Sequence, residues 1–360
     1  MIAYKIVINY FLFENVIHNN IYANIFFCFI INIYMERLCV IFGGASCEHD
    51  ISIITGMQLC KNLKAKYKLE KIYLGLDNNF YLATDIEDIK YFSDKTKINL
   101  KRIILFDNAI YVKNLFFKKH CDIACVINCC HGGVGENGDL NGFFALNKIR
   151  STAASVMSSH IAMDKTLSKT LLKDIVPTIK GIVISKQNYD ETIDIIKNEF
   201  SDELIAKPNS LGSSIGVKAV NQSDFIEQAD AILQIDDMAL IEERIENKIE
   251  YNQACLLDNN QLILSAIEQP ISKDKYLSFD EKYITSNKNK GQDRIIPANI
   301  SKTLKNKIDD YTKKIYTALR MNGIVRIDYI YDVNKKILYF NEINTIPGSM
   351  AFYLFEPVGI

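Results

Sequence analysis

The chain has 360 residues, of which 48% are hydrophobic and 24% are charged, and its formal net charge is −1. This balance is typical of a globular protein, and the length is sufficient for two or three compact units with cores of their own. There is no basic excess, so we expect no nucleic-acid partner. No block of like charges forms an interaction tail.

The nine cysteines are odd in number and irregular in spacing, which argues against a disulfide framework and favours a reducing compartment. Residues 123–129 form an apolar run of strand length, and strand residues four apart lie about 13 Å from each other, too far to share one metal ion. We therefore expect small buried thiols rather than a zinc site. The cysteine and histidine side chains concerned are His120, Cys121, Cys125, Cys129, Cys130 and His131.

The first 34 residues do not follow the pattern of the rest. Residues 21–34 are mostly apolar, but a membrane span needs about 18–20 such residues. A basic n-region and a small-residue cleavage site, which mark a signal peptide, are both lacking. Because Met35 directly precedes the first predicted strand, we expect residues 1–34 to be a non-native extension, and we expect no membrane partner.

From residue 38 onward, apolar runs of strand length alternate with segments of helical periodicity, which is typical of a parallel sheet. Residues 286–291 are polar and predict a mobile loop. The pattern predicts strands over 38–42, 71–76, 124–129, 204–207 and 239–243, helices over 50–61, 158–175 and 301–321, and a hairpin formed by 323–331 and 337–342.

Two Gly-rich turns follow predicted strands, and ligands bind at the carboxyl ends of strands in parallel sheets. One turn contains Gly43-Gly44, and the other is the run from His131 to Gly135. The first turn leads to Glu48, whose carboxylate could cap the next helix or hold a substrate ammonium group. The residues alone leave both roles open.

The predicted hairpin carries polar side chains among apolar neighbours. Arg326 and Asp328 lie two residues apart, as do Glu342 and Asn344, so each pair shares one face of its strand. A hairpin closing around Lys335 brings Asp328 level with Glu342. Hard oxygen ligands of this kind suit Mg²⁺ carried with nucleotide phosphates. An exposed hairpin with ordinary surface charges would have the same composition.

Residues 207–216 form a Gly/Ser-rich segment after a predicted strand, where backbone N–H groups can approach phosphates closely. No Lys-Ser/Thr pair closes it, so it is not a Walker A loop, and a flexible turn is the alternative. The segment Glu281-Lys282-Tyr283 precedes the polar loop. It could contribute to a functional site, or it could be a solvated charge pair beside a packing tyrosine.

Taken together and in this order, these stretches resemble the D-alanine–D-alanine ligases of the ATP-grasp superfamily over nearly the whole chain from Met35. The matching stretches are Phe42-Gly-Gly-Ala-Ser-Cys-Glu48-His-Asp50, the Gly-rich run from His131 to Gly142, Met163-Asp-Lys165, Lys207-Pro through Gly216, Ile241-Glu-Glu243, Glu281-Lys-Tyr283, Arg326-Ile-Asp328, Asn341-Glu-Ile-Asn344 and Pro347-Gly348.

The resemblance implies an α/β fold with an α+β C-terminal part, namely an ATP-grasp fold with an N-terminal Rossmann-like domain. We expect the N-terminal domain over 35–150, the central ATP-grasp subdomain over 151–240 and the C-terminal subdomain over 241–360. The family usually continues with a further helical segment, so we expect the last unit to be truncated at its end.

The resemblance also implies the site residues. The residues implied to bind ATP are Lys165, Lys207 and Lys282 at the phosphates and Glu242, Glu243 and Glu250 around the adenine and ribose. Those implied to bind two Mg²⁺ ions, with Mn²⁺ as an alternative, are Asp328, Glu342 and Asn344. Those implied to act on the amino acids are Glu48, Ser213 and Tyr283 at the first ammonium group and Arg326 and the Gly348 N–H at the oxyanion.

The implied reaction is the ATP-dependent joining of two D-alanines through an acyl phosphate, for peptidoglycan synthesis, by a cytoplasmic homodimer. Residues 286–291 would form part of a lid. Tyr283 favours D-alanine as the acceptor, but Tyr353 stands where the family usually has a serine that binds the second substrate. An ATP-grasp carboxylate–amine ligase with another second substrate, or a truncated and inactive nucleotide-binding remnant, therefore remains an alternative.

Overall fold

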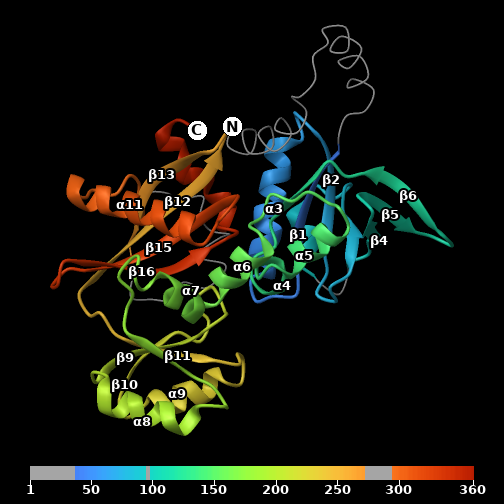
Figure 1. Cartoon of the computed structure of the whole chain (residues 1–360). Coiled ribbons are helices and arrows are strands. Elements are labelled where there is room, and N and C mark those ends of the chain that lie inside the picture. Colours follow the sequence, from blue (N-terminus) through green and yellow to red (C-terminus); the bar gives the residue numbers. More distant parts are fainter. Residues whose placement is uncertain (1–36, 95–97, 272–293) are drawn as a thin grey trace.

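The computed structural model describes residues 37–94, 98–271 and 294–360. In this part the chain forms three sheets with helices packed on their faces, and the predicted mixed α/β architecture is confirmed. Figure 1 shows the N-terminal sheet in blue and green on one side and the C-terminal sheet in orange and red on the other. The sheet that lies between them in sequence is below the C-terminal sheet. None of the helices in the described ranges combines the length and hydropathy needed to span a bilayer.

The N-terminal sheet has seven strands in the order β6-β5-β4-β3-β2-β1-β7. Only β1 with its neighbours β2 and β7 is parallel, and the remaining pairs form an antiparallel meander. The prediction of a parallel sheet was thus correct for the centre and wrong for the meander. The strands are β1 (Arg37–Gly43), β2 (Lys68–Leu74), β3 (Phe80–Leu82), β4 (Lys101–Phe106), β5 (Ala109–Lys113), β6 (Phe117–Asp122) and β7 (Cys125–Asn128).

Strand β1 is buried on both faces, as its uninterrupted apolar sequence requires. Leu38, Val40 and Phe42 pack against α3 (His49–Leu63), whereas Cys39 and Ile41 pack in the cluster that includes α5 (Asp139–Leu146). The short helices α4 (Gly133–Glu136) and η1 (Ile89–Phe92) complete this part.

The second sheet is antiparallel, with the strand order β10-β9-β11-β8. Helices α8 (Tyr189–Glu199) and α9 (Phe225–Ile232) bury their apolar sides in its core. The strands are β8 (Gly181–Ile184), β9 (Glu203–Pro208), β10 (Lys218–Asn221) and β11 (Ala239–Glu243).

The third sheet has the order β14-β13-β12-β15-β16 and is antiparallel throughout. Helix α11 (Lys302–Ala318) packs against one face, and α12 (Phe352–Phe355) packs against the other, between η2 (Gly348–Ala351) and η3 (Glu356–Val358). The strands are β12 (Lys248–Asp258), β13 (Gln261–Pro270), β14 (Arg294–Ile295), β15 (Ile324–Asp332) and β16 (Ile337–Asn344).

The prediction of one helix over residues 158–175 was wrong, because two short helices occupy this segment. α6 (Val156–Met163) ends at Asp164, whose ψ of 103° is extended, and α7 (Lys165–Leu172) starts directly after it. The Asp164 side chain accepts a hydrogen bond of 2.8 Å from the Leu167 N–H and so caps α7. The other predicted helices and strands are found, with ends shifted by a few residues.

The break between α6 and α7 depends on this cap. We expect Asp164→Ala to lower the free energy of unfolding by about 1 kcal/mol, because a first-turn N–H loses its acceptor. Asp174→Ala is the matched control, since it removes the same charge from an exposed position after α7. Urea unfolding followed by circular dichroism measures both variants. Equal losses would contradict a specific role for the cap.

Candidate active site

The hairpin of β15 and β16 carries the central charged group of the site. Arg326 is opposite Asn344 and Asp328 is opposite Glu342, so the predicted register is confirmed. Arg326 donates two hydrogen bonds to the Asp328 carboxylate, at 2.7 and 2.8 Å, and Asn344 Nδ2 donates a third at 3.0 Å. Burial and the nearby Glu342 raise the pKa of Asp328 to about 6 despite the guanidinium beside it.

These side chains have the donor chemistry that a divalent cation of the Mg²⁺ type requires. Asp328, Glu342 and Asn344 offer carboxylate and amide oxygens from neighbouring positions of one hairpin face. In this structure Arg326 holds both Asp328 oxygens, and the Asn344 amide presents its nitrogen. Asp328 Oδ1 accepts one of these hydrogen bonds and keeps a lone pair for a cation, whereas ligation by Asn344 requires its amide to turn its oxygen inward.

A cluster of lysines lies beside this hairpin. Lys165, the first residue of α7, has its Nζ 3.8 Å from Glu342, and Lys207, near the end of β9, has its Nζ 3.4 Å from the Asn341 side-chain oxygen. These residues come from three separate elements, and the structure brings them together. Together they provide positive charge next to the carboxylates of the hairpin.

The carboxylate of Glu242 is buried and is shared by two of these cations. Lys207 Nζ lies 2.7 Å from one oxygen, and Lys169 on α7 contacts the other. Burial would raise the pKa of Glu242, but the two ammonium groups outweigh burial and lower it to about 2. Burial lowers the pKa of Lys169 to about 8. The sequence analysis missed Lys169, although it lies four residues after Lys165 and therefore on the same face of α7.

Glu48, at the start of α3, lies in a niche that glycines keep open. The Ser213 hydroxyl donates a 2.5 Å hydrogen bond to Glu48 Oε1. A Cβ atom at Gly132 or Gly212 would stand 2.8 Å from Glu48 Oε2. The carboxylate makes no capping hydrogen bond to α3, so the helix-cap alternative does not account for it. Tyr283 and Lys282, expected nearby, lie outside the described residues.

Glu136, in the second Gly-rich turn, links that turn to the segment after β16. Its Oε1 accepts hydrogen bonds of 3.1 Å from the N–H groups of Thr345 and Ile346, and its Oε2 accepts one of 2.9 Å from Gly132. Burial outweighs these donors and raises the pKa of Glu136 to about 7. The residue belongs to one of the motifs named above, but its partner lies more than 200 positions away, so sequence patterns alone do not predict this contact.

Gly348 begins the segment in which the acceptor substrate was expected. A Cβ atom placed on it would meet nothing within 4 Å, so the space beside its backbone is open. Further along, the Tyr353 hydroxyl lies 3.3 Å from Glu268, a buried residue of β13 that also pairs with Arg294 at 3.2 Å. Tyr353 is therefore held by groups that the sequence analysis did not single out.

Two predicted nucleotide contacts stand apart from the lysine cluster. Glu243 follows Glu242 on β11 and lies 4.0 Å from Lys180. Glu250 on β12 forms an ion pair of 2.7 Å with Lys248. Within the described ranges, neither side chain forms an ion pair or a hydrogen bond with Arg326, Asp328, Glu342 or Asn344.

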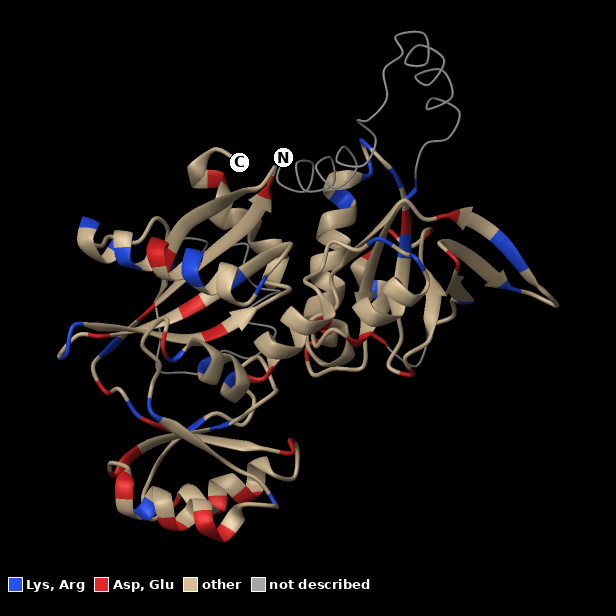
Figure 2. Cartoon of the chain, in the orientation of Figure 1, with Lys and Arg blue, Asp and Glu red and all other residues tan. Residues whose placement is uncertain are grey.

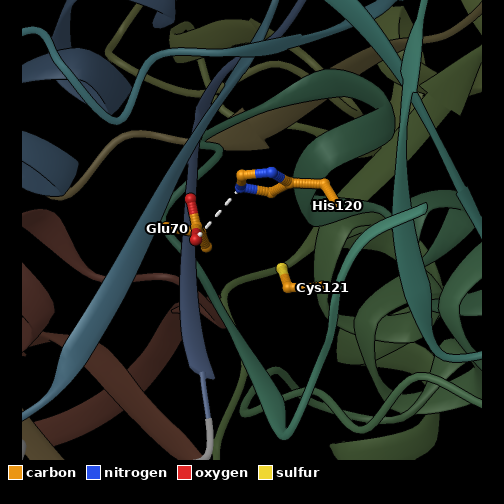
Figure 3. Close-up of side chains that lie close together, drawn as sticks. All are labelled: Glu70, His120 and Cys121. Atoms are coloured by element: carbon orange, nitrogen blue, oxygen red, sulfur yellow. Dashed lines mark ion pairs between the residues drawn. The ribbon is translucent and has the colours of Figure 1, made fainter. Parts of the chain in front are cut away.

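The cysteine and histidine run does not gather into one metal site in the described ranges. Figure 3 shows His120 and Cys121 of β6 close to Glu70, which belongs to β2. Cys125, Cys129 and Cys130 are buried elsewhere in the core. Arg37 Nη1 lies 2.5 Å from Glu70 Oε1 and 3.4 Å from His120 Nε2. This guanidinium already supplies the positive charge that a metal ion would bring to the carboxylate.

The site thus combines a half-buried hairpin of oxygen ligands, a lysine cluster and a carboxylate niche, an arrangement of charged groups that suits the active site of an enzyme. Two family profiles match the chain, "D-ala D-ala ligase N-terminus" over residues 37–154 and "D-ala D-ala ligase C-terminus" over residues 176–358. The chain belongs to the D-alanine–D-alanine ligase family, as the resemblance predicted.

Similar proteins support this assignment. The chain is 34% identical to the D-alanine–D-alanine ligase of Helicobacter pylori (strain P12) over 89% of its own length and 90% of that protein. It is 32% identical to the ligase of Campylobacter jejuni (serotype O:23/36), with 89% of each chain covered. A crystal structure of the H. pylori ligase superposes with a TM-score of 0.74 at 31% identity, over 90% of this chain and 95% of that one. The predicted ATP-grasp fold is confirmed.

The buried carboxylate of Glu136 should make stability depend on pH. Its folded pKa of about 7 lies above the ordinary 4.5, so its contribution is fully present below pH 4.5 and is lost as the pH rises through 7. Between pH 4.5 and 8, the stability of the wild type relative to Glu136→Gln should fall by up to about 3 kcal/mol. Urea unfolding at a series of pH values tests this, and a constant difference would contradict it.

The shared carboxylate of Glu242 makes Lys169 structurally necessary. We expect Lys169→Met to lower the free energy of unfolding by about 3 kcal/mol, because a buried charge loses one of its two partners. Lys173→Met, at an exposed position just after the same helix, is the control. If both variants melt at the same temperature, Lys207 alone is sufficient to neutralise Glu242.

Proposed function

We propose that the chain joins two D-alanine molecules to D-alanyl-D-alanine at the expense of ATP, the reaction for which its relatives are named. The observation that carries this proposal is the convergence of Arg326, Asp328 and Glu342 with Lys165 and Lys207 in one place. Phosphoryl transfer to a carboxylate needs positive charge around the phosphates and around the developing oxyanion.

In this proposal the residues act in two stages. The carboxylate of the first D-alanine attacks the γ-phosphorus of ATP, ADP leaves, and an acyl phosphate results. The amine of the second D-alanine then attacks the acyl carbon, and phosphate leaves. Lys165 and Lys207 hold the phosphates, with Lys282 as a third contact. Arg326 and the Gly348 N–H stabilise the tetrahedral oxyanion, where one such donor contributes roughly 3–4 kcal/mol.

Glu48 receives the ammonium group of the first D-alanine, with Ser213 and Tyr283 completing its hydrogen bonds. The 2.5 Å contact between Ser213 and Glu48 supports this role, because it fixes the carboxylate in a niche lined by glycines. Glu242, Glu243 and Glu250 border the adenine and ribose in this proposal. For Glu242 the support is its ion pair with Lys207, which links it to the phosphate contacts.

We assign the divalent metal ions, two Mg²⁺ with Mn²⁺ as an alternative, to Asp328, Glu342 and Asn344. Bound metal supplies charge neutralisation on the phosphate oxygens. The oxygen-rich donor set fits such an ion. A metal ion held by Asp328 would compete with the two hydrogen bonds from Arg326, so the guanidinium would become more available to the substrate.

The second substrate is the finer point of the proposal. A ligase of Enterococcus faecalis whose title names D-Ala and D-Ser shares the fold with a TM-score of 0.76, but its 23% identity supports nothing further. Tyr353 stands where a serine was expected, with its hydroxyl on Glu268. A carboxylate-binding contact from Tyr353 requires that hydroxyl to leave Glu268, and a different acceptor amino acid is the alternative.

The organisation of the molecule follows the three sheets. We propose three domains, 35–150, 151–240 and 241–360, one for each sheet, although the boundary at residue 240 falls within β11 (Ala239–Glu243), a strand of the second sheet. We also propose a homodimer acting in the cytoplasm in peptidoglycan synthesis. The eight described cysteines are all free thiols, as in a reducing compartment.

The deciding experiment measures ADP release by the full chain with MgATP, with and without D-alanine, and identifies the product by mass. We expect release that depends on D-alanine and forms D-alanyl-D-alanine. Glu48→Gln should raise the KM for D-alanine about tenfold or more, because the ammonium group loses a charged partner. Glu246→Gln, at an exposed position, is the control. ATP binding without any dipeptide would favour another acceptor or an inactive chain.

A further inference from the structure

The β5–β6 hairpin of the N-terminal sheet ends in an apolar tip that the reaction does not use. The tip consists of Leu115, Phe116 and Phe117, which are 91%, 80% and 49% exposed. Figure 1 shows the hairpin extending away from the rest of the molecule, on the side opposite the C-terminal sheet. Side chains so exposed contribute almost nothing to the folded core, so folding gives no reason for three apolar residues here.

Positive charge surrounds the tip. Lys113 precedes it, and Lys118 and Lys119 follow it, while no acidic residue occurs between residues 108 and 121. Figure 2 shows this hairpin with an uncharged end and blue segments behind it. Lys119 is paired with Asp122 at 2.6 Å, whereas no ion pair of Lys113 or Lys118 is recorded within the described ranges.

The neighbouring strand adds to this charge. Ile103 of β4 pairs with Val112 of β5, so Lys101 and Arg102, which precede Ile103, lie at the same end of the sheet as the tip. At the opposite end, Phe106 pairs with Ala109, and acidic residues (Asp107 and Asp122) are present. Within β4, β5 and β6 the basic excess therefore lies at the end that carries the exposed apolar residues, although Asp85, Glu87 and Asp88 follow β3, whose Leu82 pairs with Lys101.

We propose that this hairpin tip docks on an anionic lipid surface, with the three apolar side chains entering the interface and the lysines contacting the headgroups. Aromatic side chains and lysines are the residues that prefer this boundary. The contact is peripheral and needs no spanning helix. It revises the expectation of no membrane partner, and it leaves the ligase site on the other side of the N-terminal sheet open.

A second copy of the chain fits the tip less well. A symmetric contact places the same patch on both subunits, so Lys113 and Lys118 would face their own copies. The tip is also a narrow projection, whereas a stable dimer buries about 800 Å² on each partner. A flat negative surface satisfies both the apolar tip and the surrounding charge.

The test is co-sedimentation of the full chain with vesicles of phosphatidylcholine alone or mixed equally with phosphatidylglycerol. We expect binding to the mixed vesicles only, weakened by salt. Leu115→Ser with Phe116→Ser should weaken it at least tenfold while leaving ligase activity without vesicles unchanged. Phe106→Ser is the apolar control at the other end of the sheet.

Lys113→Gln with Lys118→Gln should weaken binding roughly 25-fold, at about fivefold per lysine. The matched control, Lys302→Gln with Lys313→Gln, should not weaken binding.

The lack of tryptophan in the chain allows a direct second measurement. Phe116→Trp introduces a single tryptophan at the tip, and its emission should shift to the blue with mixed vesicles, whereas that of Phe106→Trp should not. Three results would overturn the proposal. They are no binding to mixed vesicles, binding that the Leu115 and Phe116 changes leave intact, or a wild-type dimer that these changes convert to a monomer without any effect of lipid.

Discussion

The charged groups at the centre of this site are buried or largely buried, with side-chain exposures of 20% for Arg326 and 13% for Asp328, so each one needs a partner of opposite charge. Removing a carboxylate or an ammonium group from water costs several kcal/mol, and only close pairing offsets that cost. Arg326 neutralises Asp328, and Lys169 with Lys207 neutralises Glu242. These pairs hold the site together before any substrate arrives, and they also define what a substrate must do. A charged ligand that binds here has to compete with these existing pairs.

The same requirement explains why the site lies between elements that are distant in sequence. β15 supplies one pair of opposite charges itself, Arg326 and Asp328. Glu342 on β16 and Glu242 on β11, in contrast, have their cations on α7 and β9. Two hydrogen-bonded links then fix the N-terminal sheet against this group. Glu136 accepts from Thr345 and Ile346, and Glu48 accepts from Ser213 across 165 positions of sequence. The acceptor segment around Gly348 is positioned by the N-terminal domain as much as by its own.

Sequence patterns predicted the parts of this arrangement that depend on local geometry. The two-residue period of a strand placed Arg326 beside Asp328, and the length of the turn set the register of Asp328 against Glu342. The break at Asp164 was missed because apolar periodicity continues through it, while one side chain turns the backbone. The β3–β6 meander was missed because β3 has only three residues and β6 is mostly polar, so neither gives a clear strand pattern. The role of Glu136 depends on a contact across the fold, for which one sequence carries no signal.

The exposed hairpin tip and the buried site both depend on how side chains interact with water, but in opposite ways. In the site, charges are removed from water and must be paired. At the tip, apolar side chains are left in water and lysines stand around them with few acids nearby. The folded chain gains no stability from Leu115 at 91% exposure, and a polar residue there would improve solubility. Exposed apolar side chains surrounded by lysines are therefore explained by a surface outside the chain that offers both hydrocarbon and negative charge. A lipid interface offers both within a few ångströms.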